Sequence, residues 1–451
     1  MLIRFSVANI FSFGEEKEFN MLPAPQIGRL SEHTYNKNGF ELLKLASIYG
    51  ANAAGKSNLI KALAMLQEIV TEEKLLARDT RFKFRERLET PQILGTEFFQ
   101  KEKAYYYALK ITGNKISEEE LYESGLGAKQ DCLIFERKTN EENRTSIHFF
   151  DEFAKEKENV VLKTVIEKNL SKSDKPILKL LTTLNNPYLD SVKNAFEWFE
   201  NTLQIITPDS KPRALTQRID IDPEFHKYAE DTLRAFHVGI NNLKVEKKTI
   251  KEFFGENNEK ELNELIYKVE SSPNKIISFR NKNDEFIISK EKEEFYIKQL
   301  KLEHLGKNEK NFFFDLDEES DGTLRLLDFI PAFKDIFCND KVYIIDEIER
   351  SIHPVLIKEM VRKFSADKET KGQLIFTTHE SNLLDQDIFR QDEIWFAEKD
   401  KAGNTDLYAL SSFKEHTIAD LRKGYLTGRY GAIPFLGNLR DLNWHEYDIR
   451  K

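Results

Sequence analysis

Gly50-Ala51-Asn52-Ala53-Ala54-Gly55-Lys56-Ser57 is the stretch that decides the fold of this chain. It matches the pattern G-x-x-x-x-G-K-[ST], which is the phosphate-binding loop. Leu45 to Tyr49, just before it, form an apolar run typical of a buried strand, and the apolar residues after it recur at helical spacing. A strand, a glycine loop and a helix in this order predict an α/β chain that binds nucleotide phosphates.

The residues of this loop have distinct expected roles. Glycines allow the backbone N–H groups to turn inward around a β-phosphate. Lys56 is expected to reach the β- and γ-phosphates, and the Ser57 hydroxyl to bind Mg²⁺. The sequence therefore assigns ATP binding to eight positions, which are Gly50, Asn52, Ala53, Ala54, Gly55, Lys56, Ser57 and Asn58.

A second motif, Val342 to Glu347, is an apolar strand that ends in two acids. Asp346 is expected to hold Mg²⁺ together with Ser57. Glu347, one residue further on, is expected to orient the attacking water and to accept its proton. An acid pair after a strand is, by itself, typical of a solvated strand end. Its occurrence in one chain with the phosphate-binding loop favours the catalytic interpretation.

Two weaker motifs complete the set. His379 follows a short apolar strand, Gln373 to Thr377, and is expected to contact the γ-phosphate as a second catalytic residue. Ser320 and Gly322 open a helical pattern before the acid pair, and a helix N-terminus attracts anions. Because the phosphate-binding loop already serves this chain's own nucleotide, Ser320 and Gly322 are expected to contact the nucleotide of another subunit. A structural histidine and an ordinary helix cap are the alternatives.

The order of these motifs resembles that of ABC-type ATPase heads, the family of transporter motors, Rad50 and the SMC proteins. Met1 to Phe13 is similar to the opening of Rad50-like heads, whereas Ile344 to Pro354 and Tyr425 to Pro434 resemble the bacterial AAA15 family. Within that family, the RloA and abortive-infection AbiL ATPases, which act against phage, are the nearest. This resemblance implies a P-loop NTPase with a mixed sheet and an antiparallel β-lobe, which hydrolyses ATP between associated heads. It also implies a dimer or higher homo-oligomer.

The chain departs from the family pattern at three points, of which the first is Ile10, where the family usually has Phe. Its signature loop, Glu319 to Thr323, is ESDGT, where the family has LSGGQ. This loop keeps the serine and the following glycine that contact phosphate. A glutamine-loop residue is not singled out, since Gln92 and Gln100 are both candidates.

The expected organisation has four parts. Residues 1–150 form the first half of the head with an antiparallel lobe, and residues 311–400 form the second half. Residues 151–310 are expected to be a mainly helical insertion, because this stretch is helical in pattern, charged and poor in glycine. It has no sustained heptads, so a long coiled coil is not expected. Residues 401–451 are expected to cap the head. They are too short for a second α/β domain and carry no D-x-D, so no nuclease activity is expected in this chain.

Composition narrows the choice of environment and partners. The chain has 451 residues, of which 40% are hydrophobic and 32% charged, and its net charge is −9. No apolar stretch is long enough for a membrane span, and two distant cysteines suit a reducing cytoplasm. The acidic charge argues against extensive nucleic-acid coating. One basic patch is interleaved with Phe82 and Phe84, and this pattern fits local contact with nucleic acid. The alternative is an ordinary solvated face. The patch consists of Arg78, Arg81, Lys83, Arg85 and Arg87.

Three functions compete at this point. The first is an ATPase sensor or regulatory subunit of a bacterial anti-phage module that controls a separately encoded effector, such as a nuclease or toxin. The second is a DNA-repair or recombination ATPase of the Rad50/SMC kind, which the missing coiled coil disfavours. The third is a transporter motor, which the long segment between the phosphate-binding and signature loops disfavours.

Overall fold

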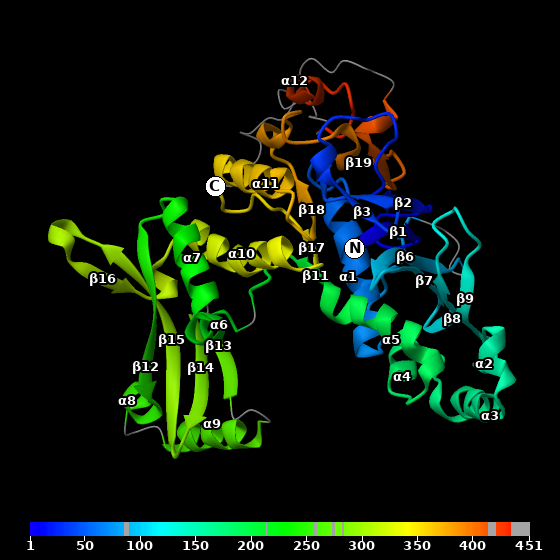
Figure 1. The fold of residues 1–451 in the computed structure, drawn as a ribbon, viewed down its shortest axis with the longest axis horizontal. Helices are drawn as coiled ribbons and strands as arrows, with labels where there is room; N and C mark the ends of the chain where they lie inside the picture. Colours follow the sequence, from blue (N-terminus) through cyan, green and yellow to red (C-terminus); the bar gives the residue numbers. More distant parts are fainter. Residues whose placement is uncertain are drawn as a thin grey trace, which may run out of the picture. The chain divides into compact units, whose positions relative to one another are not determined.

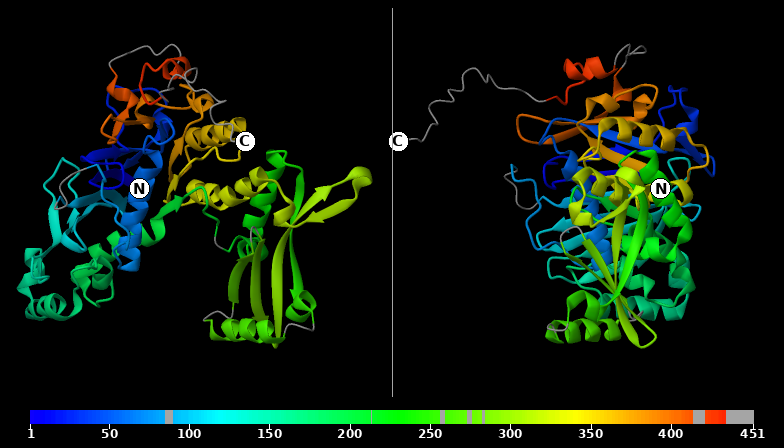
Figure 2. Two further views of the ribbon diagram at one scale, coloured as in Figure 1. Left: turned by 180° about the vertical axis from the view of Figure 1, so that it is seen from behind. Right: turned by 90° about the vertical axis from the view of Figure 1, so that its left-hand side faces the viewer.

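The computed structural model describes residues 1–84, 90–212, 214–255, 259–272, 276–281, 284–413 and 421–433 (Figures 1 and 2). The chain divides into two compact units. Unit 1 comprises Met1–Thr207, Asp340–Ile348 and Val361–Lys451. Unit 2 comprises Pro208–Asn339 and Glu349–Met360.

A six-stranded sheet forms the centre of unit 1, with the strand order β11-β17-β18-β5-β19-β20. The first five strands are parallel and β20 is antiparallel to β19. Strands β5, β17 and β18 are fully buried, which suits continuous apolar runs within a parallel sheet. The strands are β5 (Leu45–Tyr49), β11 (Leu203–Ile206), β17 (Val342–Ile345), β18 (Gln373–Thr378), β19 (Ile394–Lys399) and β20 (Thr405–Ala409).

A seven-stranded antiparallel sheet is the second layer of unit 1, with the order β10-β9-β8-β7-β6-β1-β2. It lies within residues 1–150, where an antiparallel lobe was expected, and Gly113 turns the β7–β8 hairpin with a φ of 61°. The strands are β1 (Leu2–Ala8), β2 (Lys17–Asn20), β6 (Gln92–Gln100), β7 (Lys103–Thr112), β8 (Lys115–Glu123), β9 (Cys132–Thr139) and β10 (Thr145–Phe149). A separate two-stranded sheet joins β3 (Thr34–Lys37) to β4 (Phe40–Leu43).

Helix α1 (Lys56–Glu72) carries one side of the main hydrophobic core of unit 1. Leu59, Leu63 and Leu66 share this core with residues of both sheets, and Phe98 of β6 stacks on Trp198 at 4.2 Å between ring centroids. Among the described residues, the other helices of unit 1 that are longer than three residues are α2 (Asp151–Lys155), α3 (Lys157–Val165), η2 (Ile166–Leu170), α4 (Leu178–Thr182), α5 (Asp190–Glu197), η4 (Trp198–Thr202) and α12 (Leu421–Leu426). Helix α11 (Pro354–Ala366) is shared by both units.

Unit 2 is an antiparallel sheet covered by helices. Its strands run in the order β12-β15-β14-β13, and β16 also pairs with β15. Helix α7 begins at Pro223 because Asp222 caps it by accepting the N–H of Phe225, and proline suits the first helical position. The elements are α6 (Leu215–Ile221), α7 (Pro223–Ala235), β12 (Ile240–Thr249), α8 (Ile250–Phe254), α9 (Glu259–Ser271), β13 (Ile276–Asn281), β14 (Asp284–Glu291), β15 (Glu294–Leu305), β16 (Asn311–Phe314) and α10 (Asp321–Cys338).

The stretch 151–310 differs from the mainly helical segment that the sequence led us to expect. Its first part is helical, but β11 then joins the central sheet of unit 1, and β12 to β15 form most of the sheet of unit 2. The division between units therefore falls at Thr207 and Pro208, instead of at 150 and 310. Strand β12 has charged side chains on its solvent face, so its charge content resembles that of an exposed helix.

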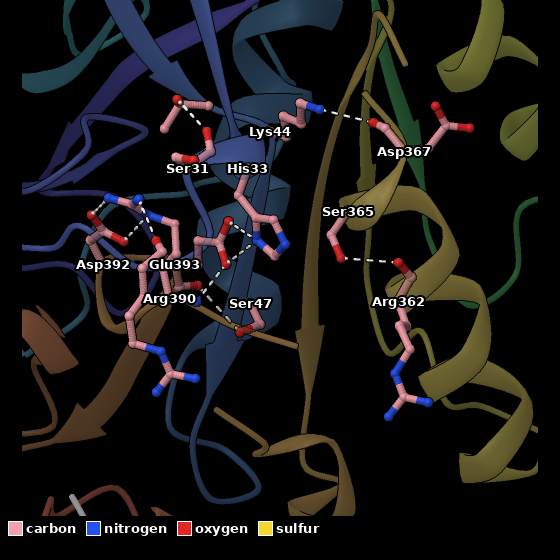
Figure 3. Close-up of polar contacts among 12 residues, drawn as sticks. Ser31, His33, Lys44, Ser47, Arg362, Ser365, Asp367, Arg390, Asp392 and Glu393 are labelled. Atoms are coloured by element: carbon pink, nitrogen blue, oxygen red, sulfur yellow. Dashed lines mark hydrogen bonds and ion pairs between the residues drawn. The ribbon is translucent and has the colours of Figure 1, made fainter. Parts of the chain in front are cut away.

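A buried polar cluster joins two segments of unit 1, at His33 and at residues 390–393 (Figure 3). His33 Nδ1 lies 3.0 Å from Glu393 Oε1, and both side chains are almost inaccessible to solvent. Burial raises the pKa of Glu393 to about 6, although its hydrogen bond with His33 opposes that shift. Beside this pair, Arg390 forms a buried ion pair with Asp392 at 2.7 Å. Removing charged groups from water costs free energy, and the hydrogen bonds and the ion pair among these four residues offset part of that cost.

Candidate nucleotide-binding site

The loop between β5 and α1 has the backbone that the glycine pattern predicts. Ala53 and Gly55 have φ values of 65° and 108°, and Gly55 precedes the first residue of α1. A Cβ atom at Gly50 would lie 2.4 Å from the carbonyl oxygen of Ala397. Glycine is therefore required at both ends of the loop, at Gly55 by conformation and at Gly50 by close packing. Asn52 and Ala53 are exposed at the tip of the loop.

Lys56 folds back over this loop. Its ammonium group donates to the carbonyl oxygens of Gly50 at 2.7 Å and Ala51 at 3.1 Å. The side chain is only 7% exposed, which places a positive charge in a largely desolvated position. Such a charge attracts an anion strongly, because little water screens it.

A hydrogen-bonded chain joins the P-loop helix to the strand that ends in two acids. Ser57 Oγ lies 3.0 Å from Asp346 Oδ1, and the Thr377 hydroxyl donates to the same oxygen at 2.6 Å. Thr377 belongs to β18, so this carboxylate links the ends of three consecutive sheet strands. Neighbouring parallel strands end at one edge of the sheet, which is where ligands bind in such folds.

Glu347 is fixed through the same threonine. Its backbone N–H donates to Thr377 Oγ1 at 2.8 Å, and its φ is 52°. A left-handed backbone is costly for a residue with a side chain, and strained residues of this kind gather at functional sites. Its half-buried carboxylate follows Asp346 directly, as the sequence predicts for a catalytic base. His379 is exposed in the segment that follows β18.

Two residues whose roles the sequence did not suggest, Ser12 and Thr405, form hydrogen bonds that hold the P-loop and the start of α1. Thr405 Oγ1 lies 3.0 Å from the carbonyl oxygen of Ala54 and 2.7 Å from Ser12 Oγ. Asn58 donates to the same Ser12 oxygen at 2.8 Å. A Cβ at Gly55 would lie 2.1 Å from Thr405 Oγ1, so this contact also requires a glycine. Ser12 belongs to the motif that opens the chain, whereas Thr405 carries no recognisable sequence signal.

Ser57 and Asp346 are the donors available to the metal that is expected to accompany a nucleotide. Ser57 and Asp346 together offer a hydroxyl and a carboxylate oxygen, which are ligands that Mg²⁺ accepts alongside phosphates and water. The residues therefore fit a magnesium ion that arrives with its nucleotide. In the part of the chain that the structure describes, no group of three or more His, Cys, Asp and Glu side chains is arranged for a metal.

The signature loop lies in unit 2. Ser320 caps α10 by accepting the N–H of Thr323 at 3.2 Å, and its side chain is exposed. A Cβ at Gly322 would lie 2.8 Å from the carbonyl oxygen of Ser351, so close packing requires glycine there. The helix-cap interpretation of Ser320 is therefore correct within one chain, and contact with another subunit's nucleotide stays a prediction.

The remaining predicted residues have local partners. Gln92 donates to Thr80 Oγ1 at 2.9 Å, and Gln100 accepts from Thr202 at 3.1 Å, at opposite ends of β6. In the basic patch, Arg81 pairs with Asp79 at 2.7 Å. The guanidinium of Arg78 lies 5.9 Å from the ring of Phe11, which is the distance of a weak cation–π contact. Phe82 is buried and Phe84 exposed. Arg85 and Arg87 lie outside the described residues.

Across the described parts of both units, no helix has the length and apolar character to cross a membrane.

Comparisons with known proteins identify a matching family and similar solved structures. Residues 45–385 match the family described as "AAA domain, putative AbiEii toxin, Type IV TA system". The solved "SMC head domain from Thermotoga maritima" covers 90% of this chain and 98% of its own, with 10% identity and a TM-score of 0.38. The SMC head in the structure titled as bound to the C-winged helix domain of ScpA covers 90% and 97%, with 11% identity and a TM-score of 0.38. No curated protein matches the chain.

Proposed function

Because the chain belongs to the family described as AAA domain, putative AbiEii toxin, Type IV TA system, we propose that it is an ATPase that binds and hydrolyses ATP with Mg²⁺. The single observation that carries this proposal is the hydrogen-bonded chain from Ser57 through Asp346 and Thr377 to Glu347. It places a hydroxyl, a carboxylate and a second, independent carboxylate at the sheet edge where the P-loop begins.

The expected chemistry follows from these residues. Lys56 exchanges the carbonyl oxygens of Gly50 and Ala51 for phosphate oxygens, which are charged and bind an ammonium group more strongly. Ser57 and Asp346 would hold Mg²⁺, which would supply neutralising charge at the phosphates when bound. Glu347 orients the attacking water and accepts its proton. His379 donates to the γ-phosphate from the segment after β18.

Association of heads is the second part of the proposal. Ser320 and Gly322 of one chain contact the nucleotide held by the P-loop of another. The exposed serine at the start of an 18-residue helix supports this role, since a helix N-terminus carries partial positive charge. The assembled species is a dimer or a higher homo-oligomer.

The biological role that we propose is regulatory. The chain acts as the sensor of an anti-phage module and controls a separately encoded effector, a nuclease or a toxin. The family description names a type IV TA system, which supports a role in such a module, and it gives the name of putative toxin to the AAA domain itself. Binding and hydrolysis of ATP would change the assembly of heads and thereby the effector's contacts.

Two experiments test these proposals. The purified chain is expected to release phosphate from ATP in Mg²⁺ and to stop in EDTA; no release in Mg²⁺ would disprove the ATPase assignment. Cells that express the chain with its genomic neighbour are expected to resist phage, whereas cells with either gene alone are not. Strong stimulation of hydrolysis by DNA, without protection from phage, would favour the Rad50/SMC-like alternative.

A further inference from the structure

Thr377 contacts three consecutive residues that follow strand β17. Its hydroxyl donates to Asp346 Oδ1 at 2.6 Å and accepts the backbone N–H of Glu347 at 2.8 Å. Its carbonyl oxygen accepts the N–H of Ile348 at 3.2 Å. Thr377 is completely buried, so little water competes for these hydrogen bonds. A single residue of β18 therefore sets the path of the segment that carries both acids.

The two N–H groups that Thr377 accepts belong to successive residues. In an extended strand, successive N–H groups point to opposite sides, so one neighbouring residue could not accept both. Glu347 has a φ of 52°, a left-handed backbone that turns both groups toward the same residue. This conformation is costly for a residue with a Cβ atom. The two hydrogen bonds to Thr377 offset that cost and hold the turn.

The Thr377 hydroxyl has one proton, so its two hydrogen bonds have fixed directions. The N–H of Glu347 can only donate, and therefore the hydroxyl proton is left for the carboxylate of Asp346. Hydrogen bonds in a chain polarise one another, so a hydroxyl that donates is also a stronger acceptor. A valine has nearly the same shape but can neither donate nor accept. The hydroxyl, and not the volume of the side chain, is thus what links Asp346 to the turn at Glu347.

We propose that Thr377 is a positioning residue, whose hydroxyl holds the turn at Glu347 and thereby aims the carboxylate of Glu347 at the attacking water. This inference rests on the proposed function, in which Glu347 is the base. A base must lie within hydrogen-bond reach of the proton that it accepts, so a relaxed turn would slow proton transfer. Thr377 acts through Glu347, and its loss is therefore expected to lower turnover without weakening ATP binding.

Amide hydrogen exchange of the nucleotide-free chain, resolved to single residues by NMR, tests the turn without any assay of activity. Thr377→Val is expected to speed exchange of the Glu347 N–H about tenfold, because that N–H loses its acceptor. Thr377→Ser keeps the hydroxyl and is expected to exchange like the parent. Parental exchange at Glu347 in Thr377→Val would show that the hydroxyl does not hold the turn.

Thr96→Val is the matched control for the loss of a buried hydroxyl. Thr96 is also completely buried in unit 1, but it lies in β6 of the seven-stranded sheet and donates to the carbonyl oxygen of Arg4 at 3.3 Å. This variant is expected to keep parental exchange at Glu347 and parental turnover. Equal acceleration at Glu347 in Thr96→Val would mean that the loss of any buried hydroxyl loosens the unit, and it would overturn the specific role of Thr377.

Steady-state kinetics with ATP test the catalytic consequence. Thr377→Val is expected to lower kcat about tenfold and to change KM by less than about twofold, whereas Thr377→Ser restores turnover. Because Glu347→Gln already removes the base, adding Thr377→Val to it is expected to lower kcat no further. A multiplied loss in the double variant, or a raised KM with parental kcat, would show that Thr377 acts apart from Glu347. If the parent hydrolyses no ATP, the proposed function fails; if the parent is active and Thr377→Val equals it, only the role of Thr377 fails.

Discussion

The P-loop edge of unit 1 and the exposed loop and strand of unit 2 differ in how their polar groups and side chains are satisfied. In unit 1, polar side chains are largely buried and hydrogen-bonded to one another. Asp346 accepts hydrogen bonds from two hydroxyl groups, and Thr377 donates to Asp346 and accepts from the backbone N–H of Glu347. In unit 2, Ser320 and β16 face solvent. The first arrangement is complete within one chain, whereas for Ser320 of the second we propose contacts with another molecule.

This difference indicates where each kind of substitution acts. A change at the unit 1 site alters a geometry that the chain builds alone, so its effect is expected at any protein concentration. A change at Ser320 of unit 2 alters the contact that we propose between chains, so its effect is expected to depend on concentration. Four substitutions test this contrast, in order of decreasing expected effect.

Glu347→Gln is expected to lower ATP turnover about 10²- to 10⁴-fold and to preserve ATP binding, because an amide cannot accept the proton of water. Single-turnover kinetics and equilibrium binding measure the two effects separately. Asp387→Asn, which removes an exposed carboxylate of the same unit, serves as the control. If the Glu347 variant turned over ATP at the parental rate, another residue would have to be the base.

Lys56→Ala is expected to weaken ATP binding about 10- to 100-fold, since it removes a charge-assisted contact from a poorly screened position. Fluorescent-nucleotide titration measures this change. Lys61→Ala, on the exposed side of the same helix, is expected to bind like the parent. If the two variants weaken binding equally, general electrostatic attraction accounts for the effect and the P-loop geometry does not.

Glu393→Gln is expected to become more stable relative to the parent by about 2 kcal/mol as the pH rises from 4 to 7. Burial raises the pKa of Glu393 to about 6 in the folded chain. The folded state therefore retains a proton that the unfolded state loses near pH 4.5. The stability linked to that proton is complete below pH 4.5 and is lost as the pH rises through 6. Glutamine does not titrate, so it carries no such loss.

Urea unfolding followed by tryptophan fluorescence measures this shift, because Trp198 and Trp395 are buried in unit 1. Asp387→Asn again reports the effect of an ordinary surface charge. A stability difference that stays constant between the two pH values would mean that Glu393 ionises as easily in the folded chain as in the unfolded one.

Ser320→Arg is expected to lower turnover about tenfold and to reduce ATP-dependent association, while a monomer still binds ATP normally. A bulky cation at the start of α10 blocks approach of another chain's nucleotide and opposes the helix dipole. Light scattering with and without ATP measures association. Ser320→Thr keeps the helix cap and is expected to behave like the parent. Loss of ATP binding by monomeric Ser320→Arg would refute the proposed division of roles between the units.

Much of the unit 1 site could be predicted from sequence because its chemistry depends on short, contiguous motifs. The P-loop pattern located Lys56 and Ser57, and the apolar run before two acids located Asp346 and Glu347. Apolar runs located β5, β17 and β18, and an antiparallel lobe was expected within residues 1–150. These features are local, so one stretch of sequence contains the whole signal.

The features that escaped prediction are set by distant pairings. Strand β11 is four residues long, and only its position beside β17 identifies it as part of the central sheet. Thr405 is an ordinary threonine until the fold places its hydroxyl against Ala54. The sheet of unit 2 was missed because β12 is rich in charged residues and β14 is buried at six consecutive residues, so neither strand shows a clear apolar–polar alternation.

The contact of Thr405 with Ser12 has a consequence for biosynthesis. These residues are 393 positions apart, and β5 has neighbours only in β18 and β19, which are also made late. At translation rates of about 5 to 20 residues per second, roughly 20 to 80 seconds separate the emergence of the two residues from the ribosome. The P-loop is translated early, but its contacts with Thr405 cannot form until most of the chain has been synthesised. Nascent or truncated chains are therefore expected to lack a finished nucleotide site, so that ATP binding reports completion of synthesis.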